Sequence, residues 1–337
     1  MQPLEQSSLF WMNGRLARGV VEISHDPSKL EEDGFWAVQV DFEGRWTLTK
    51  FENITYKDFP TSDWEPVDST WNSSHTRDEY VAYVSQARDA IARGDFYQVN
   101  ACRILSAEYE GVLNGLFTNI LKKNPSPYAC YLQTSEQQIA SASPEIFLDI
   151  RSDEDGVYVE TSPIKGTSKT SEFGEKDQAE NIMIVDLMRN DLLRICDEDS
   201  IAVTRLLGVE KHPGLFHLVS DVVGKLREDF AWKDFAKSVL PAGSISGAPK
   251  SSALKFIQEN EGVRGPYCGL IGWIEKNGKK ITGQLSVGIR LFWLDDYQIH
   301  FGSGAGITWG SDPVAEWEET ELKARRLISI ASGKGVE

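Results

Sequence analysis

Runs of alternating apolar and polar residues predict β-strands along much of the chain. Gly156–Thr161 alternates with a period of two, and Phe35–Val40 and Arg45–Thr49 are strand-like runs near the N-terminus. Further strand-like runs occupy 128–134, 138–150, 202–207, 217–226, 269–275, 280–294 and 298–307. The strands come in groups with helices between the groups, which favours a largely antiparallel α+β sandwich over a doubly wound sheet.

Helical periodicity separates these groups of strands. Thr76 and Glu79 have the spacing of a capping box, and apolar residues at helical intervals predict a helix over 77–93 that ends at Gly94. Other helices are predicted at 112–123, 176–197, 230–239, 250–260 and 313–331. The helix at 176–197 carries many polar residues, Glu180 among them, so part of its polar surface should face a site or a partner.

The composition indicates two unequal parts. Residues 1–72 predict a short β-rich region that ends in a linker at 58–72, rich in Pro, Ser and Thr, and residues 73–337 predict the main domain. The net charge of −16 argues against nucleic acid or an anionic membrane as the main partner. No run of 18 apolar residues and no signal-peptide pattern occurs, so we expect a cytoplasmic protein without a membrane span.

The four cysteines, Cys102, Cys130, Cys196 and Cys268, are scattered along the chain without a C-x-x-C pair. This spacing indicates neither a zinc site nor a disulfide framework. We therefore expect reduced thiols.

Lys165 is the first candidate for catalysis, because Pro163 and Gly166 flank it just after a predicted strand. Pro163 restricts the backbone and Gly166 permits a sharp turn or a close approach to a ligand. A lysine amine can be a nucleophile only when it is neutral, so the fold would have to desolvate it or place another cation nearby. The alternative from this stretch alone is a solvated lysine in a surface turn.

Acidic residues on the last predicted helix are candidates for a metal site. Glu316 and Glu319 are three residues apart and share a helix face, with Lys323 one turn further along. Oxygen ligands without His or Cys nearby suit Mg²⁺ shared with an anionic substrate, and Glu180 could be a third ligand. A solvated acidic face is the alternative, and Glu180 could equally be an acid in the first turn of its helix.

Three further features have more than one interpretation. Glu145 lies between strand-like runs and could be a general acid, whereas His217 could be a catalyst or a structural residue. The stretch Gly243–Ser251 is not a phosphate-binding loop, because Ala248 and Pro249 separate glycine from lysine. The glycines at 302–306 do not match a dinucleotide fingerprint either, but their backbone N–H groups could bind a carboxylate.

Taken together, the motifs resemble the chorismate-utilising enzyme family over residues 76–332. The resemblance rests on blocks in the family's order: Gly94–Asn100, Ser143–Phe147, Pro163–Thr167, Asp177–Asp191, His217–Ser220, Pro241–Lys250, Arg264–Gly269, Gly304–Ile307 and Glu316–Ala324. It implies a large α/β/β/α sandwich of two mainly antiparallel sheets that enclose the site.

The resemblance also implies roles by position. Glu180, Glu316 and Glu319 match the Mg²⁺ environment that binds chorismate, and Glu145 matches a general acid for the departing C4 hydroxyl. The residues that match the groups orienting the substrate's carboxylates are Tyr267, Arg290, Gly166, Thr167, Gly304, Ala305 and Gly306, and Lys250 would add positive charge.

Lys165 separates the branches of this family. Aminodeoxychorismate synthases carry lysine at the matching position, whereas anthranilate synthases carry alanine and let ammonia attack directly. Gln98 stands where isochorismate synthases have a lysine that activates water, so it favours an amine nucleophile. His217 matches the histidine linked to pyruvate elimination in anthranilate synthases.

The resemblance implies chorismate and ammonia as substrates. No glutaminase triad is recognisable in this sequence, so the implied partners are a glutamine amidotransferase subunit and a downstream aminodeoxychorismate lyase. The open alternatives are an anthranilate-type synthase and a non-catalytic relative that binds chorismate. The second alternative conflicts with the joint presence of Glu145, Lys165 and the three candidate metal ligands.

Overall fold

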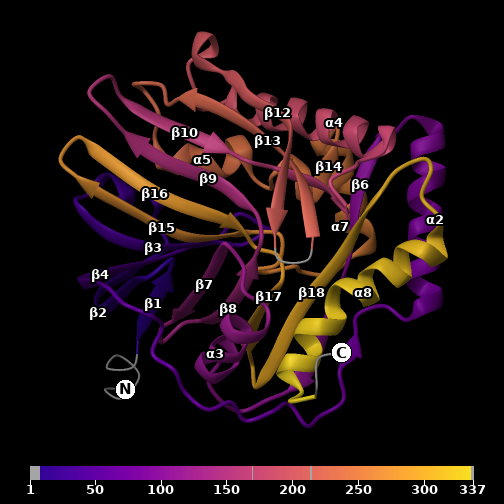
Figure 1. Cartoon of the computed structure of the whole chain (residues 1–337), viewed down its shortest axis with the longest axis horizontal. Coiled ribbons are helices and arrows are strands. Elements are labelled where there is room, and N and C mark those ends of the chain that lie inside the picture. The colour runs from indigo at the N-terminus through magenta and orange to yellow at the C-terminus, as the bar shows by residue number, and fades with distance from the viewer. Residues whose placement is uncertain (1–7, 169, 213–214, 335–337) are drawn as a thin grey trace.

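The computed structural model describes residues 8–168, 170–212 and 215–334 (Figure 1). The strands are β1 (Leu9–Met12), β2 (Arg15–Ser24), β3 (Gly34–Val40), β4 (Trp46–Tyr56), β5 (Asn72–Ser73), β6 (Gln98–Glu108), β7 (Tyr128–Gln133), β8 (Gln138–Ser143), β9 (Ile146–Ser152), β10 (Val157–Thr161), β11 (Ile164–Ser168), β12 (Ala202–His212), β13 (Leu215–Lys225), β14 (Gly247–Ala248), β15 (Leu270–Asn277), β16 (Lys280–Val287), β17 (Leu291–Asp295) and β18 (Gln298–Ile307). The helices are η1 (Pro27–Glu31), α2 (Arg77–Arg93), α3 (Asn114–Lys123), α4 (Glu175–Leu192), η2 (Glu198–Ser200), α5 (Trp232–Val239), α6 (Gly243–Ser246), α7 (Lys250–Asn260) and α8 (Pro313–Ala331).

The strands form a long antiparallel sheet. Pairing runs from β12 through β13, β10, β9, β16, β15, β3, β4, β2, β1, β7, β8, β17 and β18 to β6. Strands β10 and β11 both pair with β13, each along a different part of its length. The α+β fold with antiparallel strands is therefore confirmed, and hydrogen bonds join its layers into one continuous sheet.

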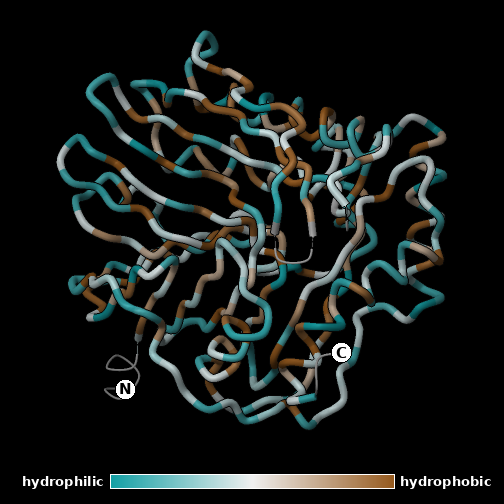
Figure 2. The backbone as a smooth tube through the Cα atoms, viewed as in Figure 1, coloured by the Kyte–Doolittle hydropathy of each residue, from teal (hydrophilic) through white to brown (hydrophobic). Residues whose placement is uncertain are grey.

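Apolar side chains cover both faces of this sheet. Strand β3 is buried at six consecutive positions from Phe35 to Val40, so it has core on each side. One apolar cluster includes Trp36, Phe147 and Trp232, and another includes Phe117 and Phe292. Figure 2 shows the hydrophilic residues gathered at the outer hairpin turns while the strands alternate in hydropathy.

The helix ends follow local sequence signals. Helix α2 begins with both hydrogen bonds of the predicted capping box between Thr76 and Glu79 and ends at Gly94 with φ +82°. Helix α8 has the predicted bounds, and Asp312 caps it. Helix α4 ends at Leu192, before the predicted 197, because Cys196 forms a β-bridge with Leu226 and the chain turns into the sheet.

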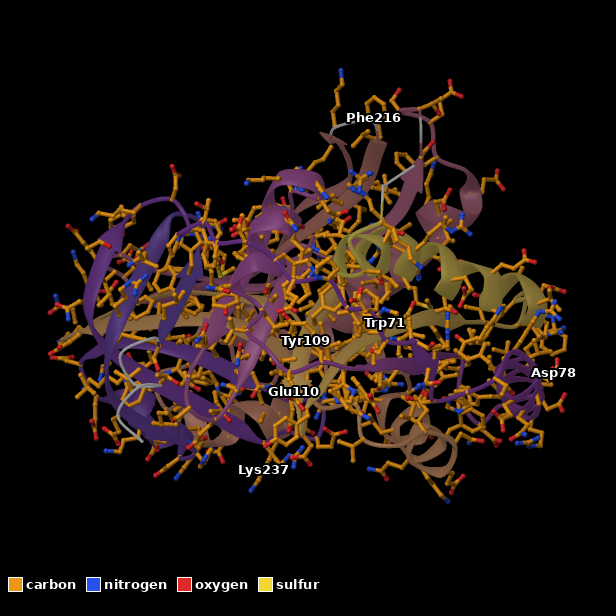
Figure 3. All side chains as sticks on the ribbon, turned by 90° about the horizontal axis from the view of Figure 1, so that it is seen from below. Trp71, Asp78, Tyr109, Glu110, Phe216 and Lys237 are labelled. Carbon is orange, nitrogen blue, oxygen red and sulfur yellow. The ribbon has the colours of Figure 1, made fainter. Side chains whose placement is uncertain are left out.

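The N-terminal region shares the sheet with the main domain. Strand β1 pairs with β7, and β3 pairs with β15. The predicted linker at 58–72 is tied to the end of α8, since Trp64 Nε1 donates to the Ala331 carbonyl at 2.8 Å and Trp71 Nε1 to Ser332 Oγ at 3.1 Å. Figure 3 shows Trp71 close to α8, whereas Phe216 lies near the projecting end of the β12–β13 hairpin.

Candidate active site

A cavity of about 230 Å³ lies where the far ends of the sheet, β6–β18 and β11–β13, meet. It is lined by seven of the residues predicted from the sequence: Glu145, Lys165, His217, Tyr267, Arg290, Gly304 and Gly306. These residues come from segments far apart in the chain, so the fold is what brings them together.

Lys165 lies in the wall of the cavity on β11. Its Nζ forms an ion pair with Glu180 Oε2 on α4 at 3.4 Å. A Cβ placed on Gly306 would lie 3.5 Å from Lys165 Nζ and 3.2 Å from Gln98 Nε2. Because Gly306 has no side chain, the Lys165 amine and the Gln98 amide can both lie close to its backbone.

Glu145 precedes β9 and is buried, with 9% of its surface exposed. Burial raises the pKa of its carboxyl to about 7, although the charge of Lys165 and the Ser244 hydroxyl act in the opposite direction. A carboxyl with this pKa is partly protonated near neutral pH, so it can donate a proton to a leaving group.

Two neighbouring cationic side chains form part of the cavity wall. Arg290 Nη1 donates to the Lys323 carbonyl at 2.9 Å, and Lys323 Nζ donates to the Gly304 carbonyl at 2.9 Å. Burial lowers the pKa of Arg290, but a guanidinium stays charged at neutral pH. This wall can therefore bind an anionic group such as a carboxylate.

Tyr267 packs against the glycine-rich strand β18. A Cβ on Gly302 would lie 2.0 Å from Tyr267 Cγ, so only glycine permits the ring to lie here. A Cβ on Gly304 would lie 3.1 Å from Tyr267 Oη. The glycines that resembled a carboxylate-binding segment therefore also make space for an aromatic wall.

Buried polar contacts position α4 over the cavity. Asn181 is fully buried, its Nδ2 donates to the Leu218 carbonyl at 3.1 Å, and its Oδ1 accepts from Ser220 Oγ at 2.6 Å. Because Leu218 follows His217 on β13, these bonds hold the helix that carries Glu180 against the strand that carries His217.

Lys250, Gly166 and Ala305 are predicted site residues that are not among the residues lining the cavity. Lys250 is not part of the cavity lining, and its Nζ contacts Asp191 Oδ1 at 2.6 Å and the Val239 carbonyl at 2.9 Å. Gly166 has φ +97° within β11, and Ala305 is buried between two lining glycines. The side chain of Thr167 is outside the part that the structure describes.

The three candidate metal ligands do not form one cluster. Among residues 8–168, 170–212 and 215–334, no three or more His, Cys, Asp or Glu side chains are grouped to hold a metal ion. Glu180 contacts Lys165, Glu319 contacts Lys323 at 2.5 Å, and Glu316 is half-buried on the same helix. Mg²⁺ often takes only one or two carboxylates together with substrate oxygens, so this donor chemistry suits it.

The structure adds lining residues that sequence reasoning did not assign. Asn100, Ser244 and Lys323 face the cavity. Asn100 lies inside a block that carried the resemblance, and Lys323 follows Glu319 by one helical turn, so both had a local signal. Ser244 had none beyond its place in a stretch of small residues. Within the described part of the chain, no helix is long and apolar enough to cross a membrane.

Comparisons with known proteins agree with this geometry. A family model described as chorismate binding enzyme matches residues 15–329. Anthranilate synthase component 1 of Aquifex aeolicus is 35% identical over 83% of this chain and 57% of its own length. Aminodeoxychorismate synthase component 1 of Salmonella typhimurium is 34% identical over 83% of this chain and 63% of its own length. The chain thus spans about three fifths of the length of these two relatives.

Solved structures share the fold. Anthranilate synthase component I of Streptococcus pneumoniae superposes with a TM-score of 0.76 at 26% identity, covering 95% of this chain and 89% of that one. The menaquinone-specific isochorismate synthase of Escherichia coli has a TM-score of 0.76 at 17% identity, covering 98% and 91%, and shows the fold alone. The family match over nearly the whole chain and the cavity lined by the expected residues lead to one conclusion: this chain belongs to the chorismate-binding enzyme family.

Proposed function

We propose that the chain is the chorismate-aminating component of an aminodeoxychorismate synthase, which converts chorismate and ammonia to 4-amino-4-deoxychorismate. The observation that supports this most is Lys165 in the wall of the cavity that Glu145 also lines. A nucleophile and an acid in one small cavity suit a reaction in which one bond to the ring forms while a hydroxyl leaves.

In the proposed reaction, the neutral Lys165 amine attacks C2 of chorismate and the ring double bonds shift. The C4 hydroxyl leaves as water after taking the proton of Glu145. Ammonia then attacks C4, the double bonds shift back, and the C2–nitrogen bond to Lys165 breaks. The new C4 ammonium group returns a proton to Glu145 through solvent, and the enzyme regains its starting state.

The other side chains would bind and orient the substrate. Arg290 and Lys323 supply positive charge to the cavity that Lys165 also lines, and Lys323 contacts the backbone of Gly304. The Gln98 amide beside Lys165 cannot accept a proton from water, which favours amination over hydration.

A Mg²⁺ ion is part of this proposal. One or two of the candidate carboxylates Glu180, Glu316 and Glu319 would hold it together with substrate oxygens, and when bound it would supply positive charge for a carboxylate of chorismate. A separate glutamine amidotransferase would supply ammonia, in line with relatives that are themselves named as component 1 of their synthases. A lyase acting on the product would then release 4-aminobenzoate.

An anthranilate-type synthase is the second candidate. His217 lines the same cavity, and relatives named anthranilate synthase component 1 are as similar as those named aminodeoxychorismate synthase component 1. Such an enzyme would form anthranilate and release pyruvate without a lyase.

Product identification distinguishes the two candidates. The purified protein is incubated with chorismate, Mg²⁺ and an ammonium salt at mildly alkaline pH, with and without an aminodeoxychorismate lyase, and aromatic products are separated by chromatography. We expect 4-aminobenzoate only with the lyase. Anthranilate without the lyase would refute the proposal in favour of the second candidate, and chorismate that is bound but never consumed would refute both.

Replacing Lys165 tests the covalent step. Lys165→Ala should abolish or redirect amination at C4, because the first displacement would lack its nucleophile. Lys279→Ala, at an exposed lysine in the β15–β16 turn, is the matched control and should keep the wild-type rate and product. An unchanged rate and product in Lys165→Ala would exclude the covalent mechanism.

A further inference from the structure

A fully buried arginine lies next to the substrate cavity without lining it. Arg264 follows α7 and has 1% of its surface exposed, and it lines a separate cleft of about 550 Å³ instead of the cavity. Glu261 balances its charge, because Arg264 Nε donates to Oε2 at 2.7 Å and Nη2 donates to Oε1 at 2.8 Å. Arg264 has no part in the proposed reaction, although it begins one of the blocks that resembled the family.

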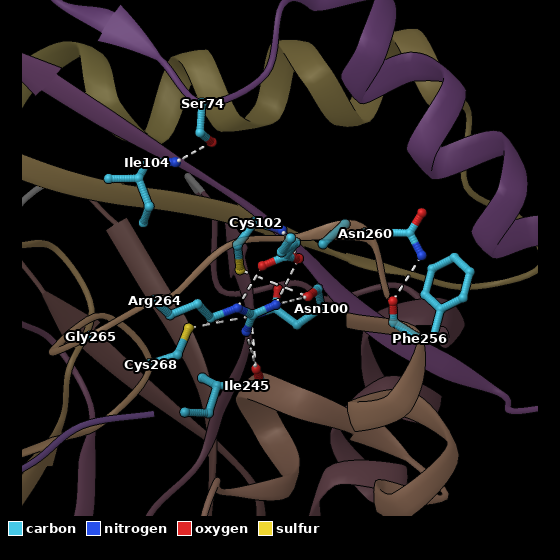
Figure 4. Close-up of polar contacts among 12 residues, drawn as sticks. Ser74, Asn100, Cys102, Ile104, Ile245, Phe256, Asn260, Arg264, Gly265 and Cys268 are labelled. Atoms are coloured by element: carbon cyan, nitrogen blue, oxygen red, sulfur yellow. Dashed lines mark hydrogen bonds and ion pairs between the residues drawn. The ribbon is translucent and has the colours of Figure 1, made fainter. Parts of the chain in front are cut away.

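The guanidinium of Arg264 bonds to the backbone of two cavity residues (Figure 4). Its Nη2 donates to the Asn100 carbonyl at 2.7 Å, and its Nη1 donates to the Ile245 carbonyl at 3.3 Å. Both residues line the substrate cavity, Asn100 from β6 and Ile245 from α6. One rigid, planar fork therefore ties together two segments of the cavity wall that are far apart in the chain.

Further hydrogen bonds extend this arrangement along the cavity wall. The backbone N–H of Tyr267, another lining residue, donates to the Arg264 carbonyl at 3.3 Å. Asn100 Nδ2 donates to the Ile245 carbonyl at 3.1 Å and to Cys268 Sγ at 3.7 Å. Because a carbonyl oxygen can only accept, the Ile245 contact fixes which end of the Asn100 amide faces the wall. Arg264 thus influences the position of a side chain that faces the substrate.

Glu261 fixes Arg264 from the side away from the cavity. Its side chain is 4% exposed, and its Oε1 accepts from Tyr83 Oη at 2.7 Å and from the backbone N–H of Cys102 at 2.9 Å. The ring of Phe42 lies 4.3 Å from Arg264 Cζ. The guanidinium is therefore held by α2, β6 and an aromatic ring, so it can serve as a fixed point for the wall.

We propose that Arg264 is a positioning residue for the reaction in the substrate cavity. It acts through Asn100, Ile245 and Tyr267 and does not itself line the cavity, and the inference rests on the proposed function of that cavity. A lysine cannot replace it, because a single ammonium has no planar fork to bond both carbonyls and Glu261 together. A misplacement of about 1 Å in the groups around a reacting substrate can lower the rate about a hundredfold.

The test compares three variants of the whole chain with the wild type. Arg264→Lys keeps a positive charge and removes the fork, and Glu261→Gln keeps the shape of the anchor and removes its charge. Arg15→Lys is the matched control, because Arg15 Nη1 also pairs with a glutamate, Glu275, at 2.9 Å and its Cζ also lies over an aromatic ring, that of Trp273, at 3.9 Å. Arg15 does not line the substrate cavity.

Steady-state kinetics with chorismate, Mg²⁺ and an ammonium salt give the first readout. Arg264→Lys should lower kcat for chorismate consumption about tenfold or more, while KM changes less, because Arg290 and Lys323 still meet the substrate. Glu261→Gln should also lower kcat, so it carries the test if Arg264→Lys does not fold. Arg15→Lys should keep the wild-type kcat, and urea unfolding shows how much stability each variant loses. An unchanged kcat in the folded Arg264 or Glu261 variant, or an equal loss in Arg15→Lys, overturns the proposal.

Hydrogen–deuterium exchange gives a second readout that needs no chorismate. In the Arg264 and Glu261 variants, backbone amides of 99–103 and 243–248 should exchange faster than in the wild type, because the fixed point that joins these segments is weakened. Arg15→Lys should leave both segments unchanged. Wild-type exchange in both segments of the Arg264 and Glu261 variants contradicts the positioning role. A wild-type protein that never consumes chorismate refutes the proposed function instead, and the exchange experiment still decides whether Arg264 positions the wall.

Discussion

Replacing Glu145 by glutamine removes a carboxyl that the folded protein keeps partly protonated near neutral pH. In the fold its pKa is raised from 4.5 to about 7, mainly by burial. Between these two values the folded protein binds more protons than the unfolded chain, so the free energy of unfolding falls as the pH rises through this range. Above pH 7 the whole cost of a buried charge is present.

The size of this cost follows from the pKa difference. At 1.36 kcal/mol per pKa unit, a rise from 4.5 to about 7 corresponds to roughly 3 kcal/mol. Glutamine has nearly the same shape and cannot ionise. The Glu145→Gln variant should therefore gain about 3 kcal/mol relative to wild type when the pH is raised from about 5 to about 8.

Urea unfolding at several pH values measures this difference. Glu154→Gln, at an exposed position in the turn before β10, is the matched control, and its stability should run parallel to that of wild type. If the free energy of unfolding of Glu145→Gln also changes with pH in parallel with that of wild type, the carboxyl ionises in the fold as it does in the unfolded chain. That result would refute the reasoning. The same pKa predicts that kcat/KM of the wild-type enzyme decreases above about pH 7, as the general acid loses its proton.

Three further changes test other parts of the structure. Gly302→Ala should destabilise the protein by about 1–3 kcal/mol and raise the KM for chorismate, because the new Cβ would meet the Tyr267 ring at 2.0 Å; thermal unfolding and kinetics measure this. Lys250→Met leaves the buried Asp191 carboxylate without its 2.6 Å partner and should cost about 3–5 kcal/mol in urea unfolding, whereas Lys250→Met with Asp191→Leu should recover most of the loss. Glu319→Gln should raise the Mg²⁺ concentration needed for half-maximal activity, and an unchanged Mg²⁺ titration would exclude this carboxylate from the metal environment.

Local patterns were sufficient for much of the secondary structure. The capping box at Thr76 and Glu79 predicted the start of α2, and Gly94 predicted its end, because both signals act within a few residues. The end of α4 was missed because it depends on a bridge between Cys196 and Leu226, which are neighbours only in the fold.

The sequence predicted part of the candidate site, because matching blocks identify residue types but not their partners in the fold. The resemblance pointed to Glu145, Lys165 and Arg290, and the cavity brings all three together. It also pointed to Lys250, whose ammonium is held by Asp191 from a distant segment. A positive residue in a matching block does not reveal its partner, because an ion pair between segments depends on tertiary packing.

The sequence by itself determined the alternation that makes strands, the helix ends and the chemical types available to the site, since these depend on neighbouring residues. Only the tertiary structure decided that β6–β18 and β11–β13 meet at one cavity and that burial raises the pKa of Glu145. Desolvation and contacts across the sheet depend on which distant segments pack together, and no short stretch of sequence encodes that.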